Sequence, residues 1–326
     1  MMGTAFFRDT SASTAFLKKF MEDYIDYIEK LNSAKEPYRG PLASLLRGGI
    51  AVPALSATAM KLVALAEDEK SSLEDIEAVI SLDPGLVSRC LQIACTSSYS
   101  RQPITEIRQA LLMLGQRQVR QVAFTSEVMS SLAEFKGDKG DKWEHYWLHS
   151  LLTARLADQL ARAFNQDTGL EYLAGLLHDC GEIFMARYFP KDWNELRSVE
   201  FEDPDDSIEI EDKQFGVNHA QVSAAIAQTL GLHSKIVRAI AFHHSPPHRR
   251  WFSIKRATSK DFLPACISMA DRLAHLAVQS GTSQQEVQLK EQPGWDTLAA
   301  FKPTWDLQLD LGLELQHAQR DLGVLL

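Results

Sequence analysis

Histidine and aspartate residues in the second half of the chain have the types and the order that suit metal chemistry. Of the ten histidines in the sequence, five join two aspartates as candidate metal ligands, the full set being His149, His178, Asp179, His219, His243, His244 and Asp271. Imidazole suits zinc, iron, manganese and nickel, and carboxylate suits harder ions. A carboxylate can also bridge two metals, which lets a site bind phosphate and activate water.

The sequence around these residues indicates that some of them are buried. His178-Asp179 follows the apolar run 173–177, and an ionised Asp179 placed there must be paired or must coordinate a cation. Each residue alone is a weak signal, because a lone histidine on a helix is more often a satisfied core or surface group. His243-His244 before Pro246 could be only a favourable helix C-terminus. The prediction of a shared site therefore depends on the order of the whole set.

Helices must bring these residues together, because they lie far apart in the sequence. Apolar residues recur at helical spacing throughout, and no sustained β alternation is present, so we predict an all-α fold. Ligands from several helices can converge in the core of a bundle. In the part that carries the candidate ligands, helices are expected at about 143–164, 168–178, 182–189, 218–230, 234–242 and 261–279.

The first half of the chain also reads as helical, with clear start signals. Ser72 is expected to cap a short helix, and Asp83-Pro84 to start another. A helix should begin at Thr105 and end at Gly115, which has the role of a C-cap. Further helices are expected at about 57–65 and 118–132.

The remaining segments are predicted as connections or appendages. Residues 14–31 read as an amphipathic helix, and residues 32–49 as an irregular connection rich in proline and glycine. Residues 136–142 and the acidic stretch 200–212 are expected to be exposed loops. The tail, residues 281–326, should end in a helix from about Leu307.

Composition excludes several functional classes. The net charge of −9 and the pI of about 5.6 disfavour nucleic-acid binding, since phosphate contacts need clustered Lys and Arg. No signal peptide and no apolar run of membrane-spanning length are present, so we expect a cytoplasmic protein without a membrane partner. The four cysteines form no CxxC pair, which fits a reducing compartment.

The order of the candidate ligands resembles the HD superfamily of metal-dependent phosphohydrolases, and more closely the HDOD family of bacterial signalling proteins. The resemblance covers about residues 50–277. The most specific segment is Ala174-Gly175-Leu176-Leu177-His178-Asp179-Cys180-Gly181. The other matching blocks are 53–55, 80–86, 104–115, 219–224 and 239–244.

The resemblance implies an HD-domain-like helical bundle with an N-terminal helical lobe, and a role in signal transduction or regulation. It divides the chain into an N-terminal helix and linker (1–49), an HDOD domain (50–280, with lobes 50–136 and 143–280) and a C-terminal extension (281–326). In catalytic relatives, the positions that match the seven candidate ligands hold two metal ions. We therefore expect a divalent transition metal, one ion or two, with iron or manganese favoured over zinc or nickel.

The sequence departs from catalytic relatives at two places near the site. Glu182 stands where cyclic-di-GMP phosphodiesterases have a phosphate-holding Lys, and Ser245-Pro246-Pro247-His248 replaces their Gly-Tyr-Pro motif. A desolvated carboxylate at that position is expected to repel a phosphate substrate and to slow turnover about a hundredfold or more. Both departures favour regulation over catalysis.

Three interpretations remain open at this stage. The favoured one is a signalling module with weak or no catalysis that binds a partner protein, as yet unidentified, and holds a metal. The second is a phosphohydrolase acting on a nucleotide or cyclic dinucleotide, with Asp179 as the catalytic residue that bridges the metals. The third is a helical protein whose polar core has lost its metal. In the first two, a phosphorylated nucleotide is a candidate ligand.

Overall fold

The computed structural model describes residues 55–67, 70–96, 104, 106–133, 140–198, 206–244, 259–281, 289, 295–299, 301 and 309–326. Within these ranges every regular element is a helix, which confirms the all-α prediction. The described residues all belong to one compact unit, Ala51–Leu326. The helix predicted at 14–31 and the connection at 32–49 lie outside the described residues.

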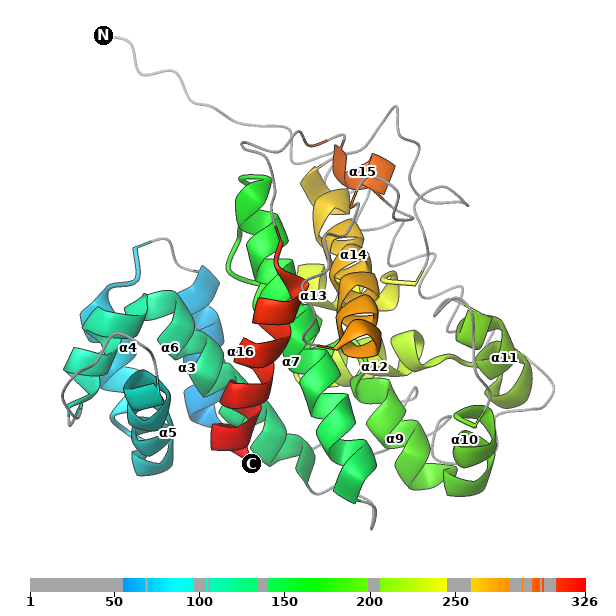
Figure 1. The fold of residues 1–326 in the computed structure, drawn as a ribbon, viewed down its shortest axis with the longest axis horizontal. Helices are drawn as coiled ribbons and strands as arrows, with labels where there is room; N and C mark the ends of the chain where they lie inside the picture. Colours follow the sequence, from blue (N-terminus) through cyan, green and yellow to red (C-terminus); the bar gives the residue numbers. More distant parts are fainter. Residues whose placement is uncertain are drawn as a thin grey trace, which may run out of the picture. The chain divides into compact units, whose positions relative to one another are not determined.

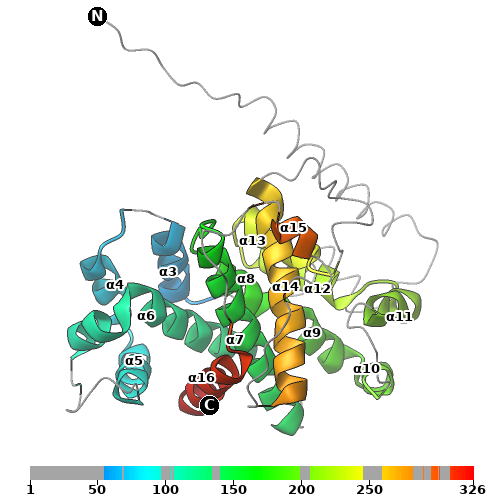
Figure 2. The ribbon, with the colours of Figure 1, turned by 45° about the horizontal axis from the view of Figure 1, so that its top comes forward.

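Four helices form the N-terminal lobe, which lies together on one side of the molecule in Figures 1 and 2. They are α3 (Ala57–Glu67), α4 (Leu73–Ile80), α5 (Pro84–Thr96) and α6 (Ile107–Leu132). Helix α6 packs against each of the other three. The core of this lobe is apolar and includes the fully buried side chains Leu62, Ile76, Ile80, Leu86, Ile93 and Leu111.

Local hydrogen bonds explain where these helices start and break. The Ser72 hydroxyl accepts from the backbone N–H of Asp75, and the Asp75 carboxylate accepts from the N–H of Ser72, forming a capping box at α4. The Asp83 carboxylate accepts from the N–H groups of Gly85 and Leu86 at the start of α5. Gly115 has φ of 81°, and this non-helical residue kinks α6 where the sequence predicts a helix end.

Eight further helices form the C-terminal lobe, which carries all the candidate ligands. They are α7 (Gly140–Ala163), α8 (Glu171–Leu177), α9 (Cys180–Tyr188), α10 (Pro190–Leu196), α11 (Asp206–Phe215), α12 (His219–Thr229), α13 (Ser234–Ala241) and α14 (Ser259–Ser280). Helix α7 runs through the middle of the molecule and packs against α8 and α14, while α12 packs against α9 and α13 (Figure 1). No described helix combines the length and the apolar composition needed to cross a membrane.

Two helices follow the C-terminal lobe, α15 (Trp295–Ala299) and α16 (Leu311–Leu325). Helix α16 lies alongside α7 and also contacts α5 and α14 (Figures 1 and 2). Its apolar side chains Leu311, Leu315, Ala318, Leu322 and Leu325 are buried. The helix predicted at the end of the tail is therefore present, starting four residues later than expected.

The loop predicted at residues 200–212 is wrong for its second half. Residues from Asp206 onward form α11, and Glu211 within it is fully buried. The acidic composition suggested solvent exposure, but the charges at Glu209 and Asp212 lie on the outer face while Ser207, Glu211 and Phe215 face inward. The loop predicted at 136–142 is similarly shortened, because α7 already begins at Gly140.

Candidate metal centre

Six helices of the C-terminal lobe bring the seven candidate ligands to one place. The residues come from within α7 and α14, from the ends of α8 and α13, and from the starts of α9 and α12. Their ligand atoms form two groups, each within 4.8 Å, which are His149, His178, Asp179 and Asp271 in the first and Asp179, His219, His243 and His244 in the second.

The first group surrounds a point between α7, α8 and α14. His149 Nε2 lies 3.0 Å from Asp271 Oδ1 and 3.5 Å from Asp179 Oδ2. His178 Nε2 lies 3.1 Å from Asp179 Oδ2 and 3.5 Å from Asp271 Oδ1. The two imidazole Nε2 atoms are 3.3 Å apart. Two imidazole nitrogens and two carboxylate oxygens thus converge from three directions.

The second group lies between α9, α12 and α13. His219 Nε2 and His243 Nε2 are each 3.3 Å from Asp179 Oδ1. His219 Nε2 is also 2.9 Å from His244 Nε2. Three imidazoles and one carboxylate oxygen therefore face each other at this second point.

Asp179 belongs to both groups through different oxygens. Its Oδ2 faces the imidazoles of His149 and His178, and its Oδ1 faces those of His219 and His243. Asp179 lies between the end of α8 and the start of α9, and its side chain makes no cap hydrogen bond to α9. Its position matches that of a carboxylate that bridges two cations.

Hydrogen bonds behind the imidazoles fix which nitrogen faces the centre. The Nδ1 of His178 is 2.7 Å from the Gly175 carbonyl oxygen, and the Nδ1 of His243 is 2.7 Å from the Ile240 carbonyl oxygen. A carbonyl oxygen can only accept, so each Nδ1 carries a proton and each Nε2 is turned toward the centre. Metal-bound histidines in proteins are oriented in the same way.

Glu211 orients His219 and was not predicted from the sequence. Its two carboxylate oxygens lie 2.9 and 2.8 Å from His219 Nδ1, and one of them also accepts from the His219 backbone N–H at 2.7 Å. The pKa of the Glu211 carboxyl is lowered, because the charge and hydrogen bonds of His219 outweigh the effect of burial. Its eight-residue spacing from His219 crosses a helix boundary, so no local pattern pointed to it.

Three buried atoms that face the centre have no hydrogen-bond partner within the described part of the chain: Asp179 Oδ1, Asp271 Oδ1 and His243 Nε2. A buried acceptor without a partner costs free energy comparable to a lost hydrogen bond or more. All three can donate a lone pair, and cations at the two groups would satisfy them, one beside Asp271 Oδ1 and the other beside Asp179 Oδ1 and His243 Nε2. The donor set therefore fits a divalent transition metal.

The charges of the centre perturb its protonation strongly. Burial opposes a charge on His178, but Asp179 and Asp271 outweigh it and raise the pKa of that imidazole to about 10. Burial and the neighbouring His275 lower the pKa of His149 to about 4. For the Asp271 carboxyl, the surrounding histidines outweigh burial and hold the pKa well below its usual value. The two aspartates thus favour a positive charge on His178, whereas burial and His275 disfavour one on His149.

His275 is a second residue that was missed from the sequence. It lies one helical turn after Asp271 in α14, with its Nε2 3.4 Å from Asp271 Oδ1, and its ring centroid is 4.4 Å from that of His149. Its side chain is 36% exposed, so it borders the centre on the solvent side. The four-residue spacing from Asp271 was the available signal, since residues four apart share a helix face.

Glu182 does not present the uncompensated charge that the sequence suggested. Its Oε1 lies 3.1 Å from Nη1 of Arg197, the residue that follows α10. Burial raises the pKa of Glu182, while the charge of Arg197 opposes that rise. The expected repulsion of phosphate at this position is therefore reduced by a paired guanidinium.

The helical architecture and a histidine/aspartate centre shared among six helices define the class of protein. The HDOD domain family matches residues 52–246, more than half of the chain. The chain belongs to the HDOD family.

Solved structures share the fold. An HDOD domain protein of unknown function from Geobacter sulfurreducens is 22% identical, with a TM-score of 0.66, over 87% of this chain and 97% of that one. A protein from Marinobacter aquaeolei VT8 named as a candidate signal transduction protein is 20% identical (TM-score 0.64; 94% of this chain, 65% of that one). A candidate phosphohydrolase from Shewanella amazonensis SB2B is 19% identical (TM-score 0.58; 87% and 96%).

A similar curated sequence is an uncharacterized protein of Treponema pallidum (strain Nichols). It is 25% identical over 203 residues, which is 60% of this chain. The match spans 38% of the Treponema protein, so that protein is considerably longer than the matched region.

Proposed function

We propose that this chain is an HDOD regulatory protein whose C-terminal lobe binds two divalent transition-metal ions and has weak or no hydrolytic activity. The observation that carries the proposal is the position of Asp179, whose two carboxylate oxygens face separate groups of imidazoles. His149, His178 and Asp271 would complete the first site, and His219, His243 and His244 the second. This mixture of nitrogen and oxygen ligands suits divalent transition metals, and the resemblance to the HD superfamily favours iron or manganese over zinc or nickel.

A regulatory role accords with the family and with the replacement of a lysine by Glu182. The Glu182–Arg197 ion pair has no net charge, whereas the lysine of catalytic relatives at the position of Glu182 is positively charged. Weak turnover is therefore expected, while binding of a phosphorylated nucleotide at the metal centre remains compatible with the geometry. The output would then pass to a signalling partner protein.

Hydrolysis of a phosphate ester is the second candidate, and the shared Asp179 is the specific observation in its favour. A pair of bound cations supplies a nucleophilic water at neutral pH and neutralises charge on the phosphate. The chain's own residues would contribute orientation. Glu211 and the carbonyl groups of Gly175 and Ile240 hold the imidazoles with Nε2 inward, and Asp179 sets the spacing of the two sites.

Metal analysis combined with an activity assay tests the proposal. Protein purified from medium containing iron and manganese should hold about two equivalents of metal, and His178→Ala should lose most of it. His233→Ala is the matched control, because this exposed histidine only caps α13 outside the centre. Cyclic-di-GMP hydrolysis with added manganese or iron should be slow or undetectable.

Two results would change the conclusion. A native protein without metal, and equally stable after His178→Ala, would contradict the metal centre. Rapid hydrolysis that Asp179→Ala abolishes would replace the regulatory proposal with the phosphohydrolase.

A further inference from the structure

Arg197 brings a positive charge to the border of an acidic metal centre. Its Nη1 pairs with Glu182 at 3.1 Å, and its side chain is 42% exposed. A guanidinium has five N–H donors, so one pairing with Glu182 leaves others for a ligand. The charges of Glu182, Asp179 and Glu211 all raise the pKa of Arg197, which places the guanidinium within the field of the centre's own carboxylates.

The Arg197 side chain is held in place by an aromatic ring. Its guanidinium carbon lies 5.7 Å from the ring centroid of Trp193, a buried residue of α10. Trp193 in turn packs against Phe215 of α11, with ring centroids 6.2 Å apart. A cation over a tryptophan face is stabilised by the ring quadrupole. The Arg197 side chain is therefore already held in place, so little side-chain entropy is lost when a ligand binds it.

Glu182 connects this guanidinium to the bridging carboxylate. The backbone N–H of Glu182 donates to the Asp179 carbonyl at 2.8 Å, so the two residues are one turn apart at the start of α9. Side chains separated by one helical turn have Cβ atoms roughly 5–6 Å apart. A group that contacts Arg197 therefore lies beside a group bound at Asp179, close enough for the two charged side chains to act on each other.

Tyr146 adds a neutral donor to the same region. Its hydroxyl is buried, and the Ser150 hydroxyl, one turn further along α7, is its hydrogen-bonding neighbour. Burial raises the pKa of Tyr146 well above its usual value, Cys180 and the carboxylates of Asp179 and Glu182 raise it further, and the hydrogen bond with Ser150 only partly opposes the rise, so the phenol keeps its proton for a ligand. Tyr146 precedes His149 by three residues on α7, which directs both side chains to one face of that helix.

We propose that Arg197 and Tyr146 form an anion subsite beside the metal centre, and that it takes the second phosphate group of a ligand whose first phosphate binds the metals. The ligand class is a compound with a diphosphate or with two phosphates in close succession, such as a nucleoside diphosphate. Glu182 holds Arg197 in position and competes with the ligand for its donors. This inference rests on the metal centre of the proposed function.

Calorimetric titration of metal-loaded protein with orthophosphate and with pyrophosphate tests the subsite. Pyrophosphate should bind the wild-type protein more tightly, and Arg197→Met should weaken pyrophosphate binding about ten- to hundredfold while affecting orthophosphate little. Arg187→Met is the matched control, because this arginine is exposed at the other end of α9. Tyr146→Phe should weaken anion binding roughly threefold to tenfold without loss of metal.

A second pair of variants separates the subsite from a purely structural ion pair. Arg197→Met alone leaves Glu182 without its partner, and Glu182→Gln leaves the half-exposed Arg197 without its carboxylate, whereas the double variant Glu182→Gln/Arg197→Met removes both charges. Glu182→Gln should bind pyrophosphate more tightly than wild type, and the double variant should lose the preference for pyrophosphate. Arg197→Lys should retain part of it. Metal content is measured after each titration, because pyrophosphate can extract metal.

Two outcomes would contradict the inference in distinguishable ways. If the protein holds metal and Glu182→Gln shows the same preference for pyrophosphate with and without Arg197, the subsite is wrong and the metal centre stands. If the wild-type protein holds no metal, both proposals fail together.

Discussion

At the scale of single residues, the geometry of the centre depends on the residues that orient the imidazole rings as well as on the candidate metal ligands. Glu211 is the clearest case, since it is fully buried and both of its oxygens contact His219 Nδ1. It fixes the tautomer that presents His219 Nε2 to Asp179 and His244. It also adds a negative charge on the far side of the His219 ring from the proposed second metal position, which would make the imidazole a better metal ligand.

We predict that Glu211→Gln lowers the affinity for the second metal ion about 10- to 100-fold, as loss of an outer-sphere partner usually does. The amide keeps the size of the side chain but loses its charge. Competition with a metallochromic chelator measures the change, and Glu209→Gln on the exposed face of α11 is the matched control. Equal metal affinity in Glu211→Gln and Glu209→Gln would show that Glu211 has no role in ligand orientation.

The seven candidate ligands could be predicted from the sequence because their types and order are themselves a motif. Glu211 and His275 could not be found in the same way. Glu211 reaches His219 only after α11 folds back onto α12, and its acidic neighbours suggested solvent. Arg197 likewise meets Glu182 through the packing of α10 on α9, which no spacing in the sequence encodes.

At the scale of helices, close approach between α9 and α12 sets the positions of Asp179 and His219. The Gly181 N–H donates to the Ser223 hydroxyl at 2.7 Å. A Cβ on Gly181 would overlap the His219 carbonyl oxygen and lie 2.8 Å from the Ser223 backbone nitrogen. The absence of a side chain therefore allows the two helices to approach where the ligands must meet.

We predict that Gly181→Ala destabilises the protein by about 1–3 kcal/mol or more, because backbone atoms of α12 cannot move aside cheaply. Metal content should fall as well, since α9 and α12 would separate. Urea denaturation measures the first effect, with Gly323→Ala in α16 as control, where a Cβ meets nothing within 4 Å. A Gly181→Ala variant as stable as the control would show that the packing of α9 on α12 is loose.

Local signals account for much of the helix prediction. Ser72 and Asp83 act as caps through contacts within three residues, so the sequence alone could place the starts of α4 and α5. The boundaries of α11 depended instead on burial of Ser207, Glu211 and Phe215 against the rest of the lobe. Such tertiary burial overrides an acidic composition and could not be inferred locally.

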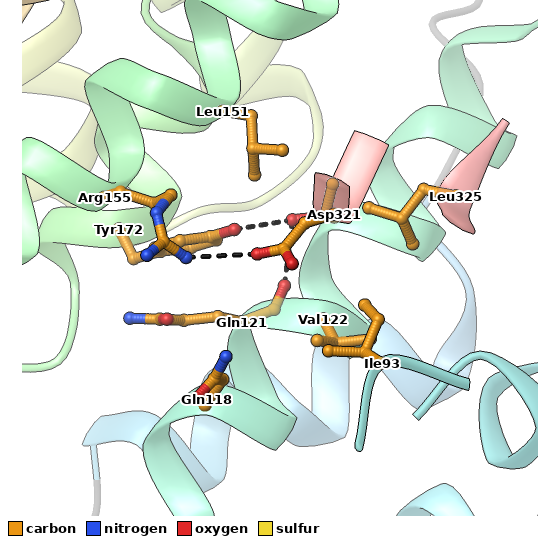
Figure 3. Close-up of a pocket in the computed structure, with 10 residues that line it drawn as sticks. Ile93, Gln118, Gln121, Val122, Leu151, Arg155, Tyr172, Asp321 and Leu325 are labelled. Carbon is orange, nitrogen blue, oxygen red and sulfur yellow. Dashed lines mark hydrogen bonds and ion pairs between the residues drawn. The ribbon is translucent and has the colours of Figure 1, made fainter. Parts of the chain in front are cut away.

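At the scale of the whole described unit, a buried charge network holds helix α16 against α7 of the C-terminal lobe, and α16 also contacts α5 of the N-terminal lobe. Arg155 of α7 pairs with Glu314 at 2.9 Å and with Asp321 at 3.1 Å, and all three side chains are largely buried. Figure 3 shows Arg155 and Asp321 beside a small cavity that Gln121 of α6 and Tyr172 of α8 also line. The Tyr172 hydroxyl bonds Thr125 of α6 at 2.8 Å. Ion pairs therefore hold α7 against α16, and a hydrogen bond holds α8 against α6.

We predict that Arg155→Met destabilises the protein by about 3 kcal/mol, because it removes the arginine partner of the buried Glu314 and leaves the buried Asp321 with Arg320 alone. The chemical-denaturation midpoint should fall accordingly. Arg162→Met on the same helix is the control. This arginine is 48% exposed, and its buried partner Asp158 keeps a second ion pair with Arg117, so the loss of Arg162 should cost less than about 1 kcal/mol. Equal stability of the two variants would mean that α16 contributes little to holding the lobes together.

Anomalous diffraction from crystals of protein loaded with manganese or iron tests the central claim most directly. The account predicts two anomalous peaks on either side of Asp179, one enclosed by His149, His178 and Asp271 and the other by His219, His243 and His244. A map with no peak at Asp179, or with ions bound only elsewhere on the protein, would contradict it.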